Sequence, residues 1–214
     1  DKNSRYHVFQ ILSKFEKRNK HLKFVRNTYF DRNNLTQHQI SRSFVLSNEV
    51  VRWKRRLDYW IDKNLDKSIK KLNPRVLQIL RLGYYESVID NSIPSYAAVN
   101  SWVELSKKIF NKKIAGFINA VLRKSNDIDP HKRDNNQTIG SWYSYPDWLV
   151  KDWIKKYGKN KTIQLCDWFN LPTYTDIRIN SNLENVKKFI SDLSIDNKNS
   201  PFSNRFIRIE SGIK

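Results

Sequence analysis

Apolar residues recur at helical spacing throughout the first 125 residues, and this pattern most limits the folds open to the chain. Near the start, positions i, i+3, i+4 and i+7 lie on one face of a helix and are occupied by Val8, Ile11, Leu12 and Phe15. No segment in this half alternates between apolar and polar residues as a half-buried strand would. The first half is therefore predicted to be an all-helical bundle.

Three start signals divide this half into separate helices. Thr36 stands three residues before Gln39, which is the spacing of a capping box. Asn73-Pro74 joins a capping residue to a proline suited to the first helical position, and Ile93-Pro94-Ser95 is a third start. The expected helices cover residues 5–15, 22–30, 36 to about 65 with one break, 74–88, 95–110 and 113–125.

The second half has a different pattern. Residues 126–141 are polar and lack an apolar period, so a linker is expected there. Helices are expected from Pro146 to Gly158 and over 161–170, followed by a strand at 175–180, a helix at 183–193 and a strand at 205–210. The predicted fold class is mainly α: a helical domain at 1–125, a linker at 126–141 and a small α+β domain at 142–214.

The net charge of +19 predicts a positive field that attracts polyanions, nucleic acid first among them. Residues 1–125 contain 26 Lys and Arg against 10 Asp and Glu, whereas residues 126–214 contain 14 against 11. The surplus therefore belongs to the helical half, which suggests a binding domain joined to a second, nearly neutral one.

The basic residues form clusters, of which RWKRR at 52–56 is the strongest. On a helix these five residues cover most of the circumference, so at least two cations should point outward together and neutralise neighbouring phosphates. For any single lysine an ordinary solvated face is the better interpretation; the combined excess favours polyanion binding. The candidate RNA-binding residues are Arg5, Arg52, Lys54, Arg55, Arg56, Lys70, Lys71, Arg75, Arg81, Lys112, Lys113, Arg123 and Lys124.

Aromatic side chains in the same half have two possible roles. They could stack on unpaired bases, but at helical spacing a place in the core is favoured, and only an exposed ring would change that. The six are Trp53, Trp60, Tyr84, Tyr85, Tyr96 and Trp102. In the segment IAGFINAVLRK, Gly116 is expected to allow close approach of a helix, and Asn119 to hold the loop around 92–94.

Features of catalytic, cofactor or metal sites are missing from the sequence. Cys166 is the single cysteine, which excludes a disulfide framework and favours a reducing, cytoplasmic location; it is expected to be a small buried residue. No apolar run is long enough to span a membrane, and no signal peptide is recognisable. The four histidines, His7, His21, His38 and His131, lack the spacing of metal ligands. The sequence also contains no glycine-rich phosphate loop and no GxSxG motif.

Several segments together resemble a known family. They are VVRWKRRLD from Val50, KLNPRVLQILRLGYYES from Lys71, IPSYAAVNSWVELSKK from Ile93 and AGFINAVLRK from Ala115. They resemble the NusB-like RNA-binding domain, in the version at the N-terminus of RsmB/Sun-type ribosomal RNA cytosine-C5 methyltransferases. YSYPDWLVKDWIKKYG from Tyr143 and PTYTDIRIN from Pro172 resemble the small domain before the catalytic domain in that family.

The resemblance implies an enzyme that uses S-adenosylmethionine and a cysteine thiolate to methylate ribosomal RNA. Neither the Pro-Cys nor the Thr-Cys motif of that chemistry occurs here, and Cys166 matches neither. We therefore expect an RNA-binding N-terminal part that holds no catalytic residue or cofactor, and that ends where the catalytic domain begins. Two alternatives stay open: a NusB-like antitermination module with a ribosomal-protein partner, and a helical protein that binds polyanions without specificity.

Overall fold

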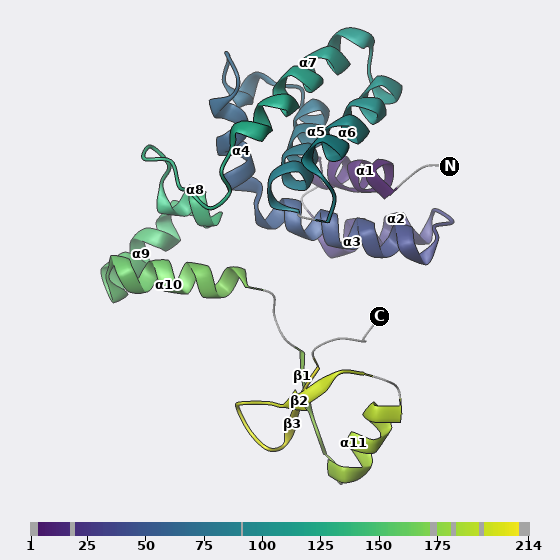
Figure 1. Cartoon of the computed structure of the whole chain (residues 1–214), viewed down its shortest axis with the longest axis vertical. Helices are drawn as coiled ribbons and strands as arrows, with labels where there is room; N and C mark the ends of the chain where they lie inside the picture. Colours follow the sequence, from purple (N-terminus) through teal and green to yellow (C-terminus); the bar gives the residue numbers. More distant parts are fainter. Residues whose placement is uncertain are drawn as a thin grey trace. The chain divides into compact units, whose positions relative to one another are not determined.

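The structure of the chain is a computed structural model that describes residues 4–17, 20–90, 92–171, 175–180, 183–192 and 195–209 (Figure 1). The chain divides into two compact units, residues 1–166 and residues 167–214. The described part of the first unit is helical, and the second is built around a small sheet. The predicted fold class, a helical bundle followed by an α+β part, is confirmed.

The helices of the bundle agree with the expected ranges to within a few residues. They are α1 Ser4–Glu16, α2 Leu22–Asp31, α3 Gln37–Arg52, α4 Lys54–Lys63, α5 Pro74–Tyr84, α6 Ser95–Ile109 and α7 Lys112–Arg123, with short 3-10 turns at Ile69–Lys71 and Lys124–Asp127 and a π-helical turn at Tyr85–Ile89. The expected break in the third helix falls at Trp53, between α3 and α4.

Two of the start signals act as the sequence predicts. The amide of Gln39 donates to Thr36 Oγ1 at 3.3 Å and the Gln39 side chain accepts from the Thr36 amide at 3.0 Å, which completes a capping box. Asn73 Oδ1 accepts from the Arg75 amide at 2.9 Å, and Pro74 takes the first helical position, where no amide hydrogen is needed.

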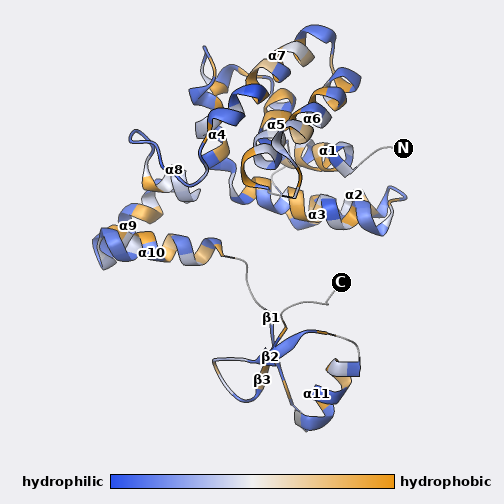
Figure 2. Cartoon of the chain, in the orientation of Figure 1, coloured by the Kyte–Doolittle hydropathy of each residue, from blue (hydrophilic) through white to orange (hydrophobic). Residues whose placement is uncertain are grey.

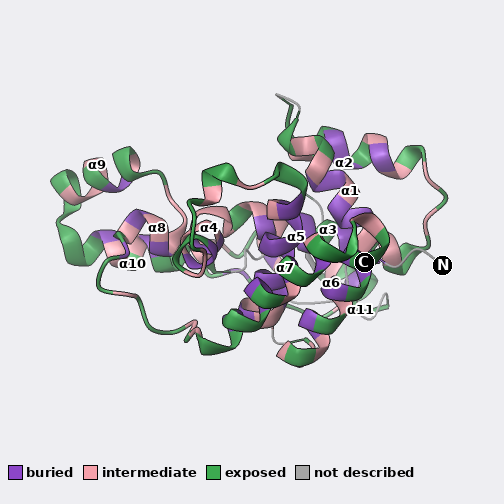
Figure 3. Cartoon of the chain, turned by 90° about the horizontal axis from the view of Figure 1, so that it is seen from above, coloured by how far each residue is buried: buried purple, intermediate pink, exposed green. Residues whose placement is uncertain are grey.

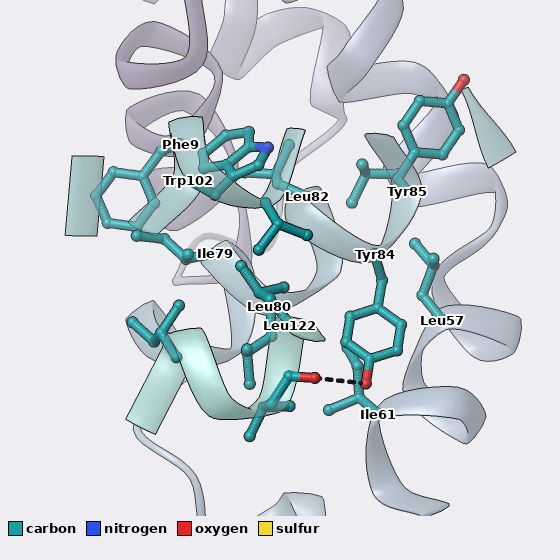
Figure 4. Close-up of a cluster of buried hydrophobic side chains, with 14 of the residues drawn as sticks. Phe9, Leu57, Ile61, Ile79, Leu80, Leu82, Tyr84, Tyr85, Trp102 and Leu122 are labelled. Carbon is teal, nitrogen blue, oxygen red and sulfur yellow. Dashed lines mark hydrogen bonds between the residues drawn. The ribbon is translucent and has the colours of Figure 1, made fainter. Parts of the chain in front are cut away.

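The core of the bundle surrounds α5, which is hydrophobic over much of its length (Figure 2) and buried almost throughout (Figure 3). Phe9 of α1 and Trp102 of α6 are fully buried beside it (Figure 4). At the far end of α5 the hydroxyl of Tyr84 donates to the Val121 carbonyl at 3.1 Å and accepts from the Asn64 side chain at 3.1 Å. Burial of each such side chain stabilises the fold by about 1.5–3 kcal/mol.

Two expectations for the last helix of the bundle are wrong. Gly116 is exposed, and a Cβ added there would meet no atom within 4 Å. The close helix approach occurs instead at Gly83 of α5, where a Cβ would lie 2.5 Å from Leu122 Cδ2. Asn119 is only half-buried and makes no side-chain hydrogen bond to any residue that the structure describes, so it does not hold the neighbouring loop.

Residues 128–166 continue the first unit beyond the bundle. They contain α8 Ile139–Tyr143, α9 Asp147–Tyr157 and the start of α10 Lys159–Asn170. Trp142 of α8 belongs to the same hydrophobic cluster as the bundle core, and Gly158 ends α9 with a φ of 78°, a conformation that favours glycine. Cys166 is fully buried, as predicted. The predicted domain boundaries at 125 and 142 stay a prediction.

The second unit holds a three-stranded antiparallel sheet in the order β1-β3-β2. Its elements are β1 Thr175–Arg178, α11 Leu183–Asp192, β2 Asn197–Asn199 and β3 Phe206–Ile209. Ile177 is paired with Ile207, and a small core contains Ile179, Ile190, Ile207 and Ile209. The predicted strand, helix and strand are confirmed within the described residues, whereas β2 was not predicted because its three residues, NKN, are all polar and exposed.

None of the helices in the described part of the chain is both long and apolar enough to cross a membrane.

Candidate nucleic-acid interface

The thirteen candidate cations differ sharply in their burial and in the ion pairs and hydrogen bonds that they make within the protein. Arg81 is almost completely buried, and its guanidinium donates twice to Asp58, at 2.6 and 2.8 Å. It also reaches Glu16 at 3.3 Å, and Lys54 donates to the same carboxylate at 2.8 Å. Burial raises the pKa of Glu16, but the hydrogen bonds and charges of Lys54 and Arg81 outweigh it, so that the pKa lies below its ordinary value.

Arg5 belongs to a second buried network. Glu86 is completely buried and accepts from Arg5 at 2.7 Å, from Arg42 at 2.6 Å and from the indole of Trp102 at 2.6 Å. A buried carboxylate with three donors satisfies its hydrogen-bonding capacity within the protein. Arg5 therefore supports the bundle, and its charge is largely neutralised by Glu86.

Asp90 continues this network at the edge of the bundle. Arg42 donates to it at 2.7 Å, and the Ser92 amide donates at 2.9 Å. Burial raises the pKa of Asp90, but the hydrogen bonds from Ser92 and Arg42 outweigh it and leave the pKa below its ordinary value.

The RWKRR segment presents less positive charge than the sequence predicts. Arg56 is buried, with its guanidinium 3.5 Å from the ring centre of Trp142, and it donates to the Pro130 carbonyl. Burial lowers the pKa of Arg56 to about 10, which still leaves it charged at neutral pH. A cation over a desolvated tryptophan contributes about 2 kcal/mol. Arg56 thus fixes α8 to α4.

Arg55 fastens the next part of the chain in the same way. Its guanidinium donates to the Tyr145 carbonyl and to Asp147 at 2.7 Å, and its amide donates to Ser144 Oγ at 3.0 Å. We call Arg55 and Arg56 with these partners the arginine clasp. In the remainder of RWKRR, Arg52 is exposed and lies 3.4 Å from Glu49, and Lys54 is paired as described above.

Five candidate cations are exposed and make no ion pair with any carboxylate that the structure describes: Lys70, Lys71, Lys112, Lys113 and Arg123. Arg75 is also exposed, with its guanidinium 5.3 Å from the ring centre of Phe9 and 5.7 Å from that of Phe110. Lys124 donates to the Asn64 carbonyl at 2.9 Å.

Contacts of Arg75 show that several of these cations share one end of the bundle. Arg75 lies in the first turn of α5, and Phe110 lies between α6 and α7. The starts of α5 and α7 and the end of α6 therefore meet, and the chain on either side of the turn from α6 into α7 is hydrophilic (Figure 2). We call this region the basic end of the bundle; it contains Lys70, Lys71, Arg75, Lys107, Lys108, Lys112 and Lys113.

The basic end contains little opposing charge. Glu104 pairs with Lys107 at 2.7 Å, and the other six cations have no carboxylate partner among the described residues. The positive ends of the α5 and α7 dipoles and the negative end of the α6 dipole lie in the same region. Lys107 and Lys108 are not among the thirteen candidates, although their closeness to Lys112 and Lys113 in the sequence already groups the four lysines in one basic cluster.

A cavity of about 440 Å³ lies near the other end of α7, between α4 and residues 124–135. Its lining combines Lys63, Lys124, Lys132 and Arg133 with Asp127, Asp129 and Asp134, and Lys63 pairs with Asp134. Because three carboxylates nearly offset the four cations, this cavity is a poorer polyanion site than the basic end.

Most of the candidate aromatic residues belong to the core. Trp60, Tyr84, Tyr85 and Trp102 are buried and Trp53 is half-buried, whereas Tyr96 is 70% exposed. Trp148 of α9 is 71% exposed, whereas the sequence pattern predicts only that it lies in a helix. The described residues contain no cluster of three His, Cys, Asp or Glu that could hold a metal ion.

Two models of known protein families match the chain. A model of the NusB family matches residues 2–127, more than half of the chain. The chain belongs to the NusB family. A second model, described as the Methyltr_RsmF/B-like, ferredoxin-like domain, matches residues 145–214. This NusB-family chain therefore joins two recognised domains.

The individual relatives include proteins named methyltransferase B and proteins named NusB. The chain is 33% identical over 135 residues to "Probable ribosomal RNA small subunit methyltransferase B" of Synechocystis sp.. This alignment covers 61% of the chain and 30% of the relative. The chain is 44% identical over 69 residues to "Transcription antitermination protein NusB" of Clostridium tetani, covering 32% of the chain and 45% of the relative. The chain thus spans less than a third of the methyltransferase B relative.

Solved structures agree with the bundle. The crystal structure of antitermination factors NusB and NusE in complex with dsRNA matches with a TM-score of 0.53 and 25% identity. The match covers 58% of this chain and 93% of that one.

Proposed function

We propose that the chain is the RNA-binding N-terminal region of an S-adenosylmethionine-dependent ribosomal RNA cytosine-C5 methyltransferase. The observation that supports this most strongly is the succession of a NusB-family domain and an RsmF/B-like ferredoxin-like domain in one chain. The name of the Synechocystis relative agrees with it. In this proposal the helical bundle binds the RNA and positions it for methylation.

The basic end of the bundle is the proposed contact with RNA. Lys107 pairs with Glu104, and the other six cations form no ion pair with a described carboxylate, so phosphates can replace counterions there without breaking existing ion pairs. By contrast, Arg56 and Arg81 are buried and held by protein groups, which removes them from the proposed contact. The proposed RNA-binding set is thus smaller than the predicted one and includes Lys107 and Lys108.

The residues that the structure describes do not fit the cofactor or the methyl-transfer chemistry. The described sheet is small and antiparallel, without a glycine-rich turn between a strand and a helix, and Cys166 is buried within the protein. We place S-adenosylmethionine binding and catalysis outside residues 1–214 of the whole protein, and derive no catalytic step from this chain.

Paired charge variants test the proposed contact. Lys112→Ala/Lys113→Ala should weaken binding of a structured ribosomal RNA fragment, measured by fluorescence anisotropy, by about tenfold or more at low salt. Lys23→Ala/Arg32→Ala removes the same charge from exposed positions of α2 and its C-cap, and should change the affinity much less. Equal losses in the two variants would contradict a localised site and favour unspecific polyanion binding.

The antitermination module is the second candidate function. It is favoured by the 44% identity to the Clostridium tetani NusB and by the likeness to the NusB–NusE–dsRNA structure. It predicts a stable complex between residues 1–127 and a NusE-like ribosomal protein, measurable by size-exclusion chromatography. Methylation of ribosomal RNA by the whole protein, lost when residues 1–127 are deleted, would instead favour the methyltransferase.

A further inference from the structure

Trp148 occupies an unusual position on α9. Val150 is buried on the inner face of this helix, whereas Trp148 is 71% exposed and makes no ring contact or hydrogen bond with any described residue. Lys151 and Lys155 follow at i+3 and i+7, so they share the outer face with Trp148. They lie about 4.5 and 10.5 Å farther along the helix axis.

The arginine clasp holds the start of this helix firmly. Arg55 of α4 contacts both the Tyr145 carbonyl and the Asp147 carboxylate, which stand immediately before Trp148. The Tyr145 and Trp153 rings pack with centroids 5.5 Å apart on the other side of the helix. The backbone at Trp148 is therefore held in place within the first unit. A ligand that binds the ring would not have to order this part of the protein backbone.

The charges around Trp148 favour one class of ligand. The carboxylates of Asp147 and Asp152 are engaged by Arg55 and Lys156 respectively, at 2.7 and 3.0 Å. Lys151 and Lys155 have no carboxylate partner among the described residues. Protein interfaces are depleted in lysine, whereas Lys151 and Lys155 stand on the same face as Trp148. An exposed aromatic ring beside free cations is typical of single-stranded nucleic-acid binding.

We propose that Trp148 is a stacking platform for an unpaired RNA base, and that Lys151 and Lys155 hold the phosphates beside it. This rests on the proposed RNA-binding function and adds a second contact, outside the residues that match the NusB family. The basic end contacts phosphates of any RNA, whereas the Trp148 face distinguishes unpaired from paired RNA. The two contacts together would select RNA that carries a single-stranded segment.

Binding of two RNAs by residues 1–214 tests this. The probes are a single-stranded oligoribonucleotide and a fully paired duplex of the same length. Trp148→Leu keeps an apolar side chain but removes the ring, and should weaken single-strand binding about 5- to 150-fold while duplex affinity stays unchanged. Trp148→Phe restores a ring and should recover most of the loss. Lys151→Ala/Lys155→Ala should lower the single-strand salt slope by about 1.4.

Two controls separate the possible failures. Phe24→Leu changes an exposed aromatic residue of α2 and should leave both affinities unchanged. If the wild-type chain binds both RNAs and Trp148→Leu binds them equally well, the stacking platform is refuted while the basic end stands. If the wild-type chain binds neither RNA, both proposals fail. Self-association that Trp148→Leu abolishes, measured by sedimentation, would overturn the platform in favour of a protein contact.

Discussion

Replacing Gly83 by alanine tests the packing of α5 against α7, with Gly116→Ala as its matched control. Both glycines lie inside helices, where alanine is favoured over glycine by about 1 kcal/mol. At Gly116 a Cβ enters open space, so the full gain should appear. At Gly83 the same Cβ would come within 2.5 Å of Leu122 Cδ2.

Leu122 cannot move away without cost, because its side chain is fully buried in the core beside α5 (Figure 4). Overpacking of a filled core costs about 1–3 kcal/mol. Gly83→Ala should therefore be between neutral and about 2 kcal/mol less stable than the wild type, and about 1–3 kcal/mol less stable than Gly116→Ala.

Urea unfolding followed by far-UV circular dichroism measures both variants, since this signal comes mainly from the helices of the first unit. Shortening Leu122 to valine should reduce the cost of Gly83→Ala, because it makes room for the added methyl group. A Gly83→Ala protein as stable as Gly116→Ala would refute the close approach of the two helices.

Three further perturbations test the polar interactions of the bundle. Glu86→Gln leaves two arginines without their shared buried carboxylate and should lower the free energy of unfolding by about 3–5 kcal/mol in urea titrations; a change below 1 kcal/mol would contradict a buried network. Tyr84→Phe removes the hydroxyl that donates to the Val121 carbonyl, and should cost about 1 kcal/mol in the same assay. The folded-state pKa values of Glu16 and Asp90 lie below their ordinary values, so their stabilisation is complete above about pH 5 and is lost as the pH falls through the folded pKa values. Thermal midpoints measured between pH 7 and pH 3 should stay level and then fall; a rise on acidification would contradict this sign.

Local signals in the sequence predicted most of the fold. The capping box at Thr36, the cap at Asn73 and the apolar period of each helix depend on residues close together in the chain, and they give the right elements. The polar strand β2 has no such signal, since its pairing with β3 depends on a partner farther along the chain.

Interactions between distant residues account for the incorrect expectations. Gly116 and Gly83 both lie in apolar helical segments, and only the packing of α5 on α7 shows which of them faces a neighbour. RWKRR reads as exposed charge because its partners, Trp142 and Asp147, lie about 90 residues away in the sequence. The candidate site changed for the same reason, as burial and ion pairing decide which cations remain available to a phosphate.

The salt dependence of RNA binding tests the central claim most directly. Wild-type residues 1–214 and the variant Lys70→Ala/Lys71→Ala/Lys112→Ala/Lys113→Ala are titrated with one structured ribosomal RNA fragment at several salt concentrations. If the basic end contacts phosphates, the logarithm of the wild-type binding constant falls steeply with the logarithm of salt, and the four substitutions reduce that slope by about 3. Equal slopes for the two proteins, or wild-type binding that does not depend on salt, would contradict an RNA contact at the basic end of the bundle.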